Sequence, residues 1–222
     1  MFDLIIKDGT VIDGTGSPGI KTDIALLDGK ISDIGSFNES EAKEIVNAEN
    51  MIVCPGFIDP HTHYDAQLFW DPYASPSNLH GVTSVVMGNC GFSIAPISDS
   101  SDAEYLGEML VQVEGMSAEA LRLGVDWKWN SFEDYLERLD GKIGVNVAAM
   151  VGHCALRRTV MKEDAVKREA TEDEIAKMQQ LLGEALEAGG LGFSTSRSFT
   201  HTDGDGLPVP SRVASVEEVL AL

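Results

Sequence analysis

The sequence predicts an α/β fold, namely a partial TIM-like (β/α) barrel of about four βα units preceded by a small antiparallel β unit. Residues 1–50 contain short apolar runs separated by turns rich in Gly and Asp, which is typical of antiparallel strands. From residue 51 onward, apolar strands alternate with helical periods, and this alternation is typical of parallel βα units. The chain of 222 residues is 43% hydrophobic, so it can form a sizeable core.

Turn residues mark the ends of the strands in the N-terminal part. The predicted strands cover residues 2–7, 10–12, 23–27, 30–34 and 44–47. The dipeptides Asp8-Gly9 and Asp28-Gly29 each lie between apolar runs, and Asp-Gly is favoured in type I′ hairpin turns. Residues 14–19 are predicted to form a surface loop, because no helical pattern follows their glycines as a dinucleotide-binding loop requires.

Strands and helices alternate in the remainder of the chain. The strands are predicted at residues 52–58, 83–87, 144–151 and 191–195, and their apolar character is that of strands covered on both faces. Apolar stripes with helical spacing lie at residues 103–113, 132–139 and 175–186. Ser131 is predicted to cap the second of these helices, and Thr171 forms a capping box with Glu174 before the third.

Residues 114–130 connect the first two of these helices and contain Trp127 and Trp129. Segments that lie above the carboxyl ends of barrel strands often form lids over active sites. Packing of the two tryptophans in the core is the alternative, and the sequence leaves both interpretations open.

The last residues predict a helix that begins at a capping box of Ser215 and Glu218 and contains about one turn. A complete (β/α)₈ barrel takes about 250 residues, whereas the predicted barrel strands here lie within residues 51–222. We therefore expect the chain to hold the N-terminal half of a barrel and to end within a helix. The free edges of such a sheet would favour self-association or pairing with a C-terminal half.

The charge of the chain excludes some partners. The chain has 36 Asp and Glu against 16 Lys and Arg, a formal net charge of −20, so nucleic acid and anionic membranes would be repelled. No apolar run approaches the roughly 20 residues of a membrane helix, and the N-terminus lacks the pattern of a secretory signal. The three cysteines are widely spaced, which argues against a disulfide framework. These features predict a cytoplasmic protein that acts on a small molecule.

Two histidines follow the first predicted barrel strand. His61 and His63 are two residues apart, so in an extended segment their side chains share a face. Imidazole is the commonest ligand for zinc-like metals, and barrel enzymes place their chemistry at the carboxyl ends of the strands. His61 and His63 are therefore predicted to bind the metal of a hydrolase. Two solvated loop histidines are the alternative.

Two segments carry a resemblance to a known family. Residues 55–65, PGFIDPHTHYD, resemble the first barrel strand of the amidohydrolase superfamily. Residues 85–96, VVMGNCGFSIAP, are similar to the segment that supplies a cysteine thiolate as a metal ligand in N-acyl-D-amino-acid deacylases, or D-aminoacylases. The resemblance implies that Cys90 is a ligand beside His61 and His63, and that one or two Zn²⁺ ions are bound.

The same resemblance implies a domain division and an activity. Residues 1–50 would be a portion of a β-sandwich, and residues 51–222 the N-terminal half of a metal-dependent hydrolase barrel. The implied reaction is hydrolysis of a carbon–nitrogen bond in an amide substrate such as an N-acyl-D-amino acid. In the family, the proton-transferring carboxylate and two more histidine ligands lie on later strands, so no catalytic carboxylate is assigned and the chain alone is expected to be poorly active.

Other functions stay open on the sequence. The chain could be a noncatalytic metal-binding fragment or an assembly partner. It could also hydrolyse a cyclic amide, although no predicted strand offers a lysine that could be carbamylated as in the cyclic-amide hydrolases.

Two further residues are candidate substrate contacts. His153 ends the third predicted barrel strand, and Arg197 follows the fourth. A guanidinium group at the mouth of the site could bind a substrate carboxylate through two parallel hydrogen bonds. A histidine that only satisfies backbone carbonyls and a solvated loop arginine are the alternatives. Residues 194–201 depart from the Gly-Leu and Tyr-Pro-Pro-Gly pattern that is common in the deacylases, which leaves the substrate open.

Overall fold

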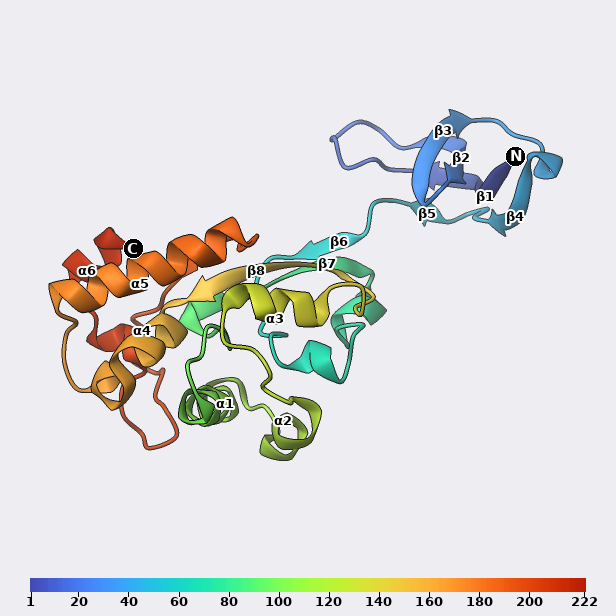
Figure 1. Ribbon diagram of the computed structural model, residues 1–222. Helices are drawn as coiled ribbons and strands as arrows, with labels where there is room; N and C mark the ends of the chain where they lie inside the picture. The colour runs from blue at the N-terminus through green and yellow to red at the C-terminus, as the bar shows by residue number, and fades with distance from the viewer. The chain divides into compact units, whose positions relative to one another are not determined.

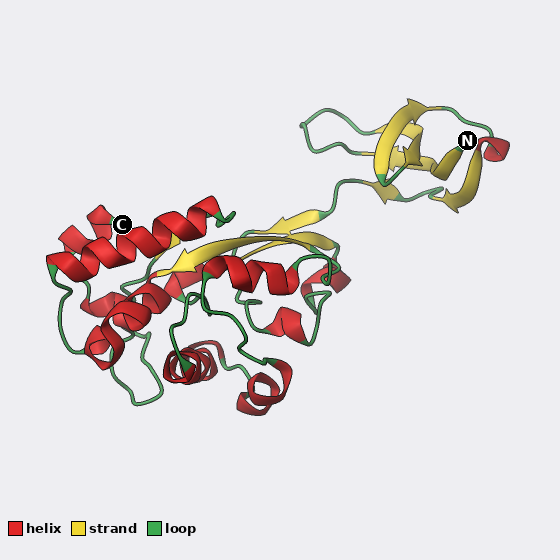
Figure 2. Ribbon diagram, in the orientation of Figure 1, coloured by secondary structure: helices red, strands yellow, loops and turns green.

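A computed structural model describes residues 1–222, which form two compact units, Met1–Gly56 and Phe57–Leu222 (Figures 1 and 2). The strands of the first unit are β1 (Phe2–Val11), β2 (Ile20–Leu27), β3 (Lys30–Gly35), β4 (Ala42–Asn47) and β5 (Ile52–Val53). The strands of the second unit are β6 (Phe57–Asp59), β7 (Val82–Met87), β8 (Asn146–Gly152) and β9 (Gly192–Ser194). Its α-helices are α1 (Ser100–Glu114), α2 (Ala118–Gly124), α3 (Phe132–Leu139), α4 (His153–Met161), α5 (Glu172–Glu187) and α6 (Val216–Ala221). None of the helices is long and apolar enough to cross a bilayer.

The first unit is a five-stranded sheet in which β1 is central. β2 pairs with β1 and β3 in antiparallel fashion, whereas β4 and β5 add to β1 as parallel neighbours. The predicted turn at Asp28-Gly29 is confirmed, since the two residues have φ angles of 51° and 72°, and a type I′ turn requires positive φ at both. The antiparallel unit expected from the sequence is therefore present, with two parallel strands added to it.

The predicted turn at Asp8-Gly9 is wrong, because β1 runs through both residues as one strand. The register between β1 and β2 shifts between Ile6 and Gly9, and Asp8 has a φ of 60°, so the dipeptide forms a β-bulge. The Asp8 N–H donates to the Asp23 carboxylate at 2.9 Å. A Cβ at Gly9 would lie 2.5 Å from the Val53 side chain, so glycine here permits the close approach of β5.

The second unit is built on a parallel sheet in the order β6-β7-β8-β9, which confirms the predicted partial barrel. The prediction of one strand over residues 52–58 is wrong in its extent. Ile52–Val53 pairs with β1 in the first unit, and the parallel sheet begins only at Phe57. Pro55 lies between the two pieces and has no N–H to donate to a ladder, which accounts for the break.

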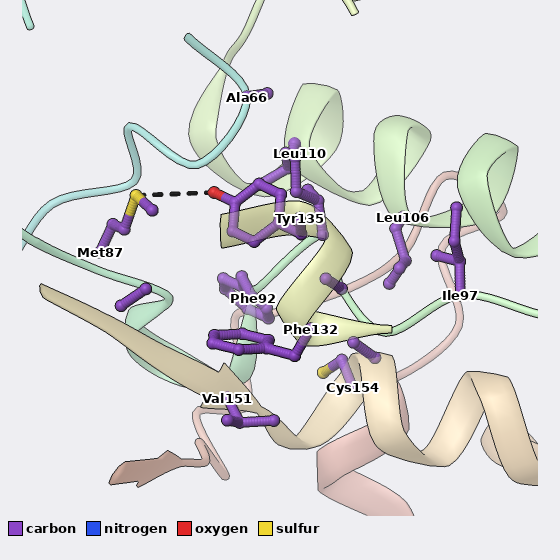
Figure 3. Packing of buried hydrophobic residues seen from close by; sticks show 14 of the residues in the cluster. Ala66, Met87, Phe92, Ile97, Leu106, Leu110, Phe132, Tyr135, Val151 and Cys154 are labelled. Carbon is purple, nitrogen blue, oxygen red and sulfur yellow. Dashed lines mark hydrogen bonds between the residues drawn. The ribbon is translucent and has the colours of Figure 1, made fainter. Parts of the chain in front are cut away.

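The core of the second unit lies between the parallel sheet and its helices. Alternate residues of the sheet, among them Met87 and Val151, are fully buried against Leu106 of α1 and Tyr135 of α3 (Figure 3). Burial of each large apolar side chain contributes about 1.5–3 kcal/mol. Ile58, on β6, is 68% exposed, so the expectation of strands covered on both faces does not hold for this chain.

Two helix starts follow the predicted chemistry, since capping boxes at Ser131 and Thr171 start α3 and α5. The helix α1 is capped by Asp99, which was not predicted. The segment 114–130 contains the helix α2, which the sequence pattern did not reveal. Trp129 is buried, and its Nε1 donates to the Ile94 carbonyl oxygen at 3.0 Å, so this tryptophan belongs to the core.

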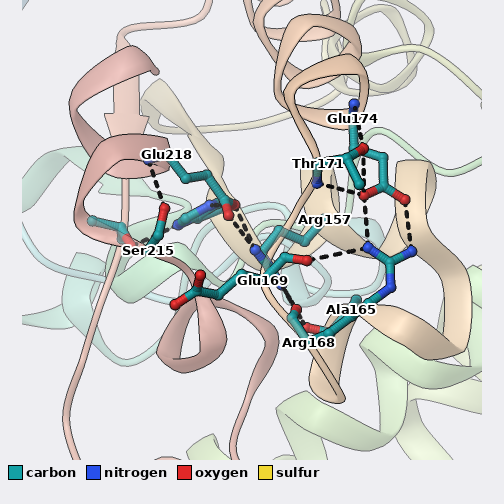
Figure 4. A network of polar contacts seen from close by, with 10 residues as sticks. Arg157, Ala165, Arg168, Glu169, Thr171, Glu174, Ser215 and Glu218 are labelled. Carbon is teal, nitrogen blue, oxygen red and sulfur yellow. Dashed lines mark hydrogen bonds and ion pairs between the residues drawn. The ribbon is translucent and has the colours of Figure 1, made fainter.

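The helix α6 starts differently from the prediction. The Ser215 hydroxyl accepts from the Glu218 N–H at 3.0 Å, as a cap does, but the Glu218 carboxylate does not reach back to Ser215. It is fully buried and accepts a hydrogen bond from Arg157 Nη1 at 2.6 Å (Figure 4). It also accepts a hydrogen bond from His153 Nε2 at 2.8 Å. The predicted capping box is therefore only half formed, because a buried ion pair uses the carboxylate.

Candidate metal centre

His61 and His63 lie directly after β6, where the chain is tied to the neighbouring strand. The backbone N–H and the hydroxyl of Thr62 both donate to the Val86 carbonyl oxygen, at 3.0 and 2.7 Å. These two bonds tie Thr62 to β7. The imidazoles of His61 and His63 therefore lie on the opposite side of the segment, with their ring centroids 5.5 Å apart. The alternation predicted for this segment accounts for the arrangement.

Cys90 lies in a short turn after β7. The residue has a φ of 56°, and its Sγ lies 3.4 Å from His61 Nε2. His61, His63 and Cys90 each offer one ligand atom, and these atoms all lie within 4.8 Å of one another. The structure therefore brings together the three residues that the sequence predicted as metal ligands.

The turn that carries Cys90 is held by buried hydrogen bonds on both sides. From β9, the Ser194 hydroxyl donates to the Gly88 carbonyl oxygen and accepts from the Gly91 N–H at 3.0 Å. Asn89 Nδ2 donates to the Val86 carbonyl oxygen at 2.9 Å. Gly88 has a φ of 75°, and a Cβ there would lie 2.1 Å from the Met150 carbonyl oxygen, so only glycine fits.

Ser194→Ala is expected to lower the free energy of unfolding by about 1–3 kcal/mol, because the buried Gly88 carbonyl and Gly91 N–H lose their partner. Urea denaturation measures the change. Ser198→Ala, in the partly exposed loop that follows, is the matched control and should stay within about 0.5 kcal/mol of the wild type. Equal values for the two variants would show that the Cys90 turn does not depend on Ser194.

Two carboxyl groups near the ligands were not identified as site residues from the sequence. Glu114 Oε1, at the end of α1, lies 3.4 Å from His63 Nε2. Asp65 is buried and accepts from the Gly88 N–H at 3.0 Å through Oδ2, while its Oδ1 has no hydrogen-bond partner. Glu114 ends an apolar helical stripe, and an acid at the C-terminus of a helix is disfavoured by the helix dipole. That misplaced charge was the only sequence signal for it.

Burial determines the protonation of these groups. It is the main cause that lowers the pKa of His63 to about 4, with smaller repulsion from His61 and His201. It also raises the pKa of Asp65 to about 7, and the Gly88 N–H opposes this rise. The imidazole of His63 is therefore neutral at pH 7 and keeps a lone pair for a metal.

The donor set fits a divalent transition metal. Two imidazoles and a thiol are the ligand types that zinc prefers, and the three ligand atoms lie close enough to share one ion. His63 Nδ1 is buried and has no hydrogen-bond partner within the chain. No Lys or Arg forms an ion pair with Glu114 or Asp65, so the chain supplies no fixed positive charge to them.

A cleft of about 600 Å³ opens beside the ligands. Both histidines and Glu114 line it, together with Tyr64 and Trp70. The cleft provides a place where a small molecule could approach the ligand atoms.

Neither of the two predicted substrate contacts lines this cleft. His153 begins α4, and its ring is fully buried, with Nδ1 2.9 Å from the Thr195 hydroxyl and Nε2 2.8 Å from Glu218. Both ring nitrogens thus have hydrogen-bond partners within the protein, and contact of His153 with substrate stays a prediction. Arg197 is exposed and forms no hydrogen bond or ion pair in the chain, so its binding of substrate stays a prediction.

Comparisons with known proteins place the chain beside metal-dependent hydrolases. Residues 44–221 match the model of the Amidohydrolase family. D-aminoacylase from Alcaligenes xylosoxydans xylosoxydans is 35% identical over 220 residues, which are 99% of this chain and 41% of that protein. N-acyl-D-aspartate deacylase from the same organism is 35% identical over 98% of this chain and 39% of its own length.

Solved structures give the same result. A D-aminoacylase crystal structure, described as defining a novel subset of amidohydrolases, aligns with a TM-score of 0.78 and 37% identity, over 100% of this chain and 42% of that one. N-acyl-D-glutamate deacylase from Bordetella bronchiseptica, complexed with zinc and a phosphonate inhibitor, aligns with a TM-score of 0.74 and 34% identity over the same shares. The chain spans about two fifths of the length of these relatives.

Proposed function

The chain belongs to the amidohydrolase family, and on this premise we propose that it contributes to a metal-dependent site that hydrolyses amide bonds of N-acyl-D-amino acids. The observation that carries the proposal is the approach of His61, His63 and Cys90, whose ligand atoms lie within 4.8 Å of one another. These residues come from the ends of β6 and β7, the edge of a parallel sheet at which barrel enzymes place their chemistry.

We propose zinc as the metal, with one or two ions. The imidazole and thiolate donors support zinc, and so does the similar N-acyl-D-glutamate deacylase, whose structure is complexed with zinc. The similar D-aminoacylase has a binuclear metal centre, which supports a number of one or two ions. A bound divalent ion supplies Lewis acidity, which polarises a carbonyl oxygen and lowers the pKa of water.

The chain's own residues have distinct roles in this proposal. His61, His63 and Cys90 hold the ion, and Asn89 and Ser194 fix the turn on which Cys90 lies. The cleft beside them admits the amide. Asp65 is buried and accepts a hydrogen bond from the Gly88 N–H, so it is not assigned to proton transfer. No other carboxylate of this chain is assigned to that role.

The domain division is also a proposal. We take the first unit as a portion of the β-sandwich that flanks the barrel in this family, and the second as the part of the barrel that holds the ligands. The compact units divide at Gly56, six residues after the boundary that the sequence pattern suggested at residue 50.

The activity is tested with the zinc-loaded chain on N-acetyl-D- and N-acetyl-L-amino acids, with release of free amino acid as the readout. We expect slow, chelator-sensitive release from the D substrates only. The rate should be well below the 1–10³ s⁻¹ typical of enzymes, because general acid–base catalysis contributes roughly 10²- to 10⁴-fold.

His63→Ala is the variant that removes a ligand, and His80→Ala, at an exposed histidine outside the cleft, is its control. Release that survives both chelation and His63→Ala would contradict the proposal. Zinc bound without any hydrolysis would instead favour a noncatalytic metal-binding chain, and a hydantoin included in the assay tests the cyclic-amide alternative.

A further inference from the structure

Asp65 is a buried carboxyl group that does not belong to the three proposed ligands. The residue is 1% exposed, its Oδ2 accepts from the Gly88 N–H at 3.0 Å, and its Oδ1 has no hydrogen-bond partner in the chain. A buried polar atom without a partner costs stability, so its presence in a folded chain requires an explanation. Packing does not supply one, because an apolar side chain would fill the same space without that cost.

The bond to Gly88 joins the two segments that carry the proposed ligands. Asp65 lies two residues after His63, and Gly88 lies two residues before Cys90. The bond therefore connects the histidine segment after β6 to the turn after β7, across 23 positions of the chain. A connection at this point limits how far the imidazoles and the thiol can move apart.

Two neighbouring bonds hold the same arrangement. Asn89 Nδ2 donates to the Thr62 carbonyl oxygen at 3.2 Å, between the two histidines. From α3, the buried Tyr135 hydroxyl donates to the Asp65 carbonyl oxygen at 3.0 Å and lies 3.6 Å from Met87 Sδ (Figure 3). Helix α3 thus supports the backbone of Asp65, and the side chain of Asp65 supports the turn.

We infer that Asp65 is a positioning residue of the metal centre, whose carboxylate fixes the histidine segment relative to the Cys90 turn before an ion binds. The inference rests on the proposed metal site of His61, His63 and Cys90. Asp65 acts through the backbone N–H of Gly88 and forms no bond of its own to the ion. Groups that orient metal ligands in this indirect way contribute roughly 10- to 100-fold in metal affinity.

The test measures the Co²⁺ affinity of the full 222-residue chain by titration, with the thiolate-to-cobalt absorption band as the signature of Cys90 ligation. Asp65→Ala leaves the Gly88 N–H without an acceptor and should weaken binding roughly 10- to 100-fold, with a weaker band. Asp65→Asn keeps an oxygen that can accept this N–H and should restore most of the affinity. Its buried amide N–H groups nevertheless lower the midpoint of thermal unfolding.

A variant that is destabilised elsewhere separates positioning from stability. Met178 of α5 is fully buried, and Met178→Ala leaves a cavity that lowers the midpoint of thermal unfolding. The three bonds that hold the ligand segments involve no residue of α5, so Met178→Ala should bind Co²⁺ as the wild type does. Far-UV circular dichroism verifies that each variant folds. Asp65→Val, which fills the space without an acceptor, serves if Asp65→Ala does not fold.

Four outcomes would overturn the inference. Equal Co²⁺ affinity in Asp65→Ala and wild type would show that the carboxylate does not position the centre. An equal loss in Asp65→Asn and Asp65→Ala would show that Asp65 acts through its charge, and an equal loss in Met178→Ala would show that affinity follows stability alone. A wild-type chain that binds no Co²⁺ through Cys90 would refute the proposed metal centre itself, and the inference with it.

Discussion

Cys90→Ala is expected to weaken zinc binding about a hundredfold or more, the largest effect on metal affinity of any single substitution in the chain. Structural zinc sites bind with roughly 10–16 kcal/mol shared among four ligands, and 1.4 kcal/mol corresponds to tenfold in affinity. Cys90 supplies the only thiol of the three ligands, and a thiolate adds a negative charge that the imidazoles lack. Competition with a chromophoric chelator measures the affinity, and elemental analysis gives the stoichiometry.

Cys54→Ala is the matched control, because Cys54 is exposed and lies in the segment before β6. Cys154 is unsuitable, since it is fully buried and its removal would create a cavity. We expect modest zinc affinity in the wild type and in Cys54→Ala, because three ligands hold an ion less tightly than four. Unchanged stoichiometry and affinity in Cys90→Ala would refute the proposed centre.

Glu218→Ala is expected to destabilise the chain by about 3–5 kcal/mol, the cost of leaving a buried charge without its partner. The side chains of Glu218, Arg157 and His153 are all fully buried, and the guanidinium would lose both of its contacts with the carboxylate. Urea denaturation measures the free energy of unfolding. Glu217→Ala, at the exposed neighbouring position, should change it by less than about 0.5 kcal/mol.

The same cluster predicts how stability depends on pH. Burial lowers the pKa of His153 below its usual 6.5, so the unfolded chain binds the proton more readily and stability falls as the pH drops below 6.5. Burial alone would raise the pKa of Glu218, but the bonds from His153 and Arg157 lower it below the usual 4.5. Its stabilisation is present above pH 4.5 and is lost as the pH falls through the folded pKa.

In Glu218→Ala the titrating carboxylate is absent, so this variant should lose the second, more acidic part of the pH dependence of stability. A series of urea denaturations between pH 3 and pH 7 measures this dependence. An identical pH dependence in wild type and Glu218→Ala would show that the buried pair does not control acid stability.

Local chemistry was sufficient to predict much of this fold. The Asp28-Gly29 turn and the capping box at Thr171 depend on residues a few positions apart, and both formed as expected. His61 and His63 were predicted from their spacing after a strand, whereas the resemblance to the deacylase segment added Cys90; the three meet because neighbouring parallel strands end at the same edge of a sheet.

Three failures share a different cause, since each depends on a partner that is distant in sequence. Asp8-Gly9 continues a strand because β5 pairs beside it, although its composition is that of a hairpin turn. Glu218 has the spacing of a capping residue, but Arg157 and His153 outcompete the local bond. Glu114 meets His63 only after α1 packs on the sheet, and no spacing within the sequence records that contact.

The bonds from Ser194 to the Cys90 turn join residues 103 and 106 positions apart in the chain. Closing so long a loop costs conformational entropy before any contact compensates for it, and chains dominated by such contacts fold slowly. The turn therefore has its full set of hydrogen bonds only when β9 lies in place beside it. Docking of β9 and completion of the three-ligand arrangement are thereby coupled, although Ser194 itself offers no ligand to the proposed ion.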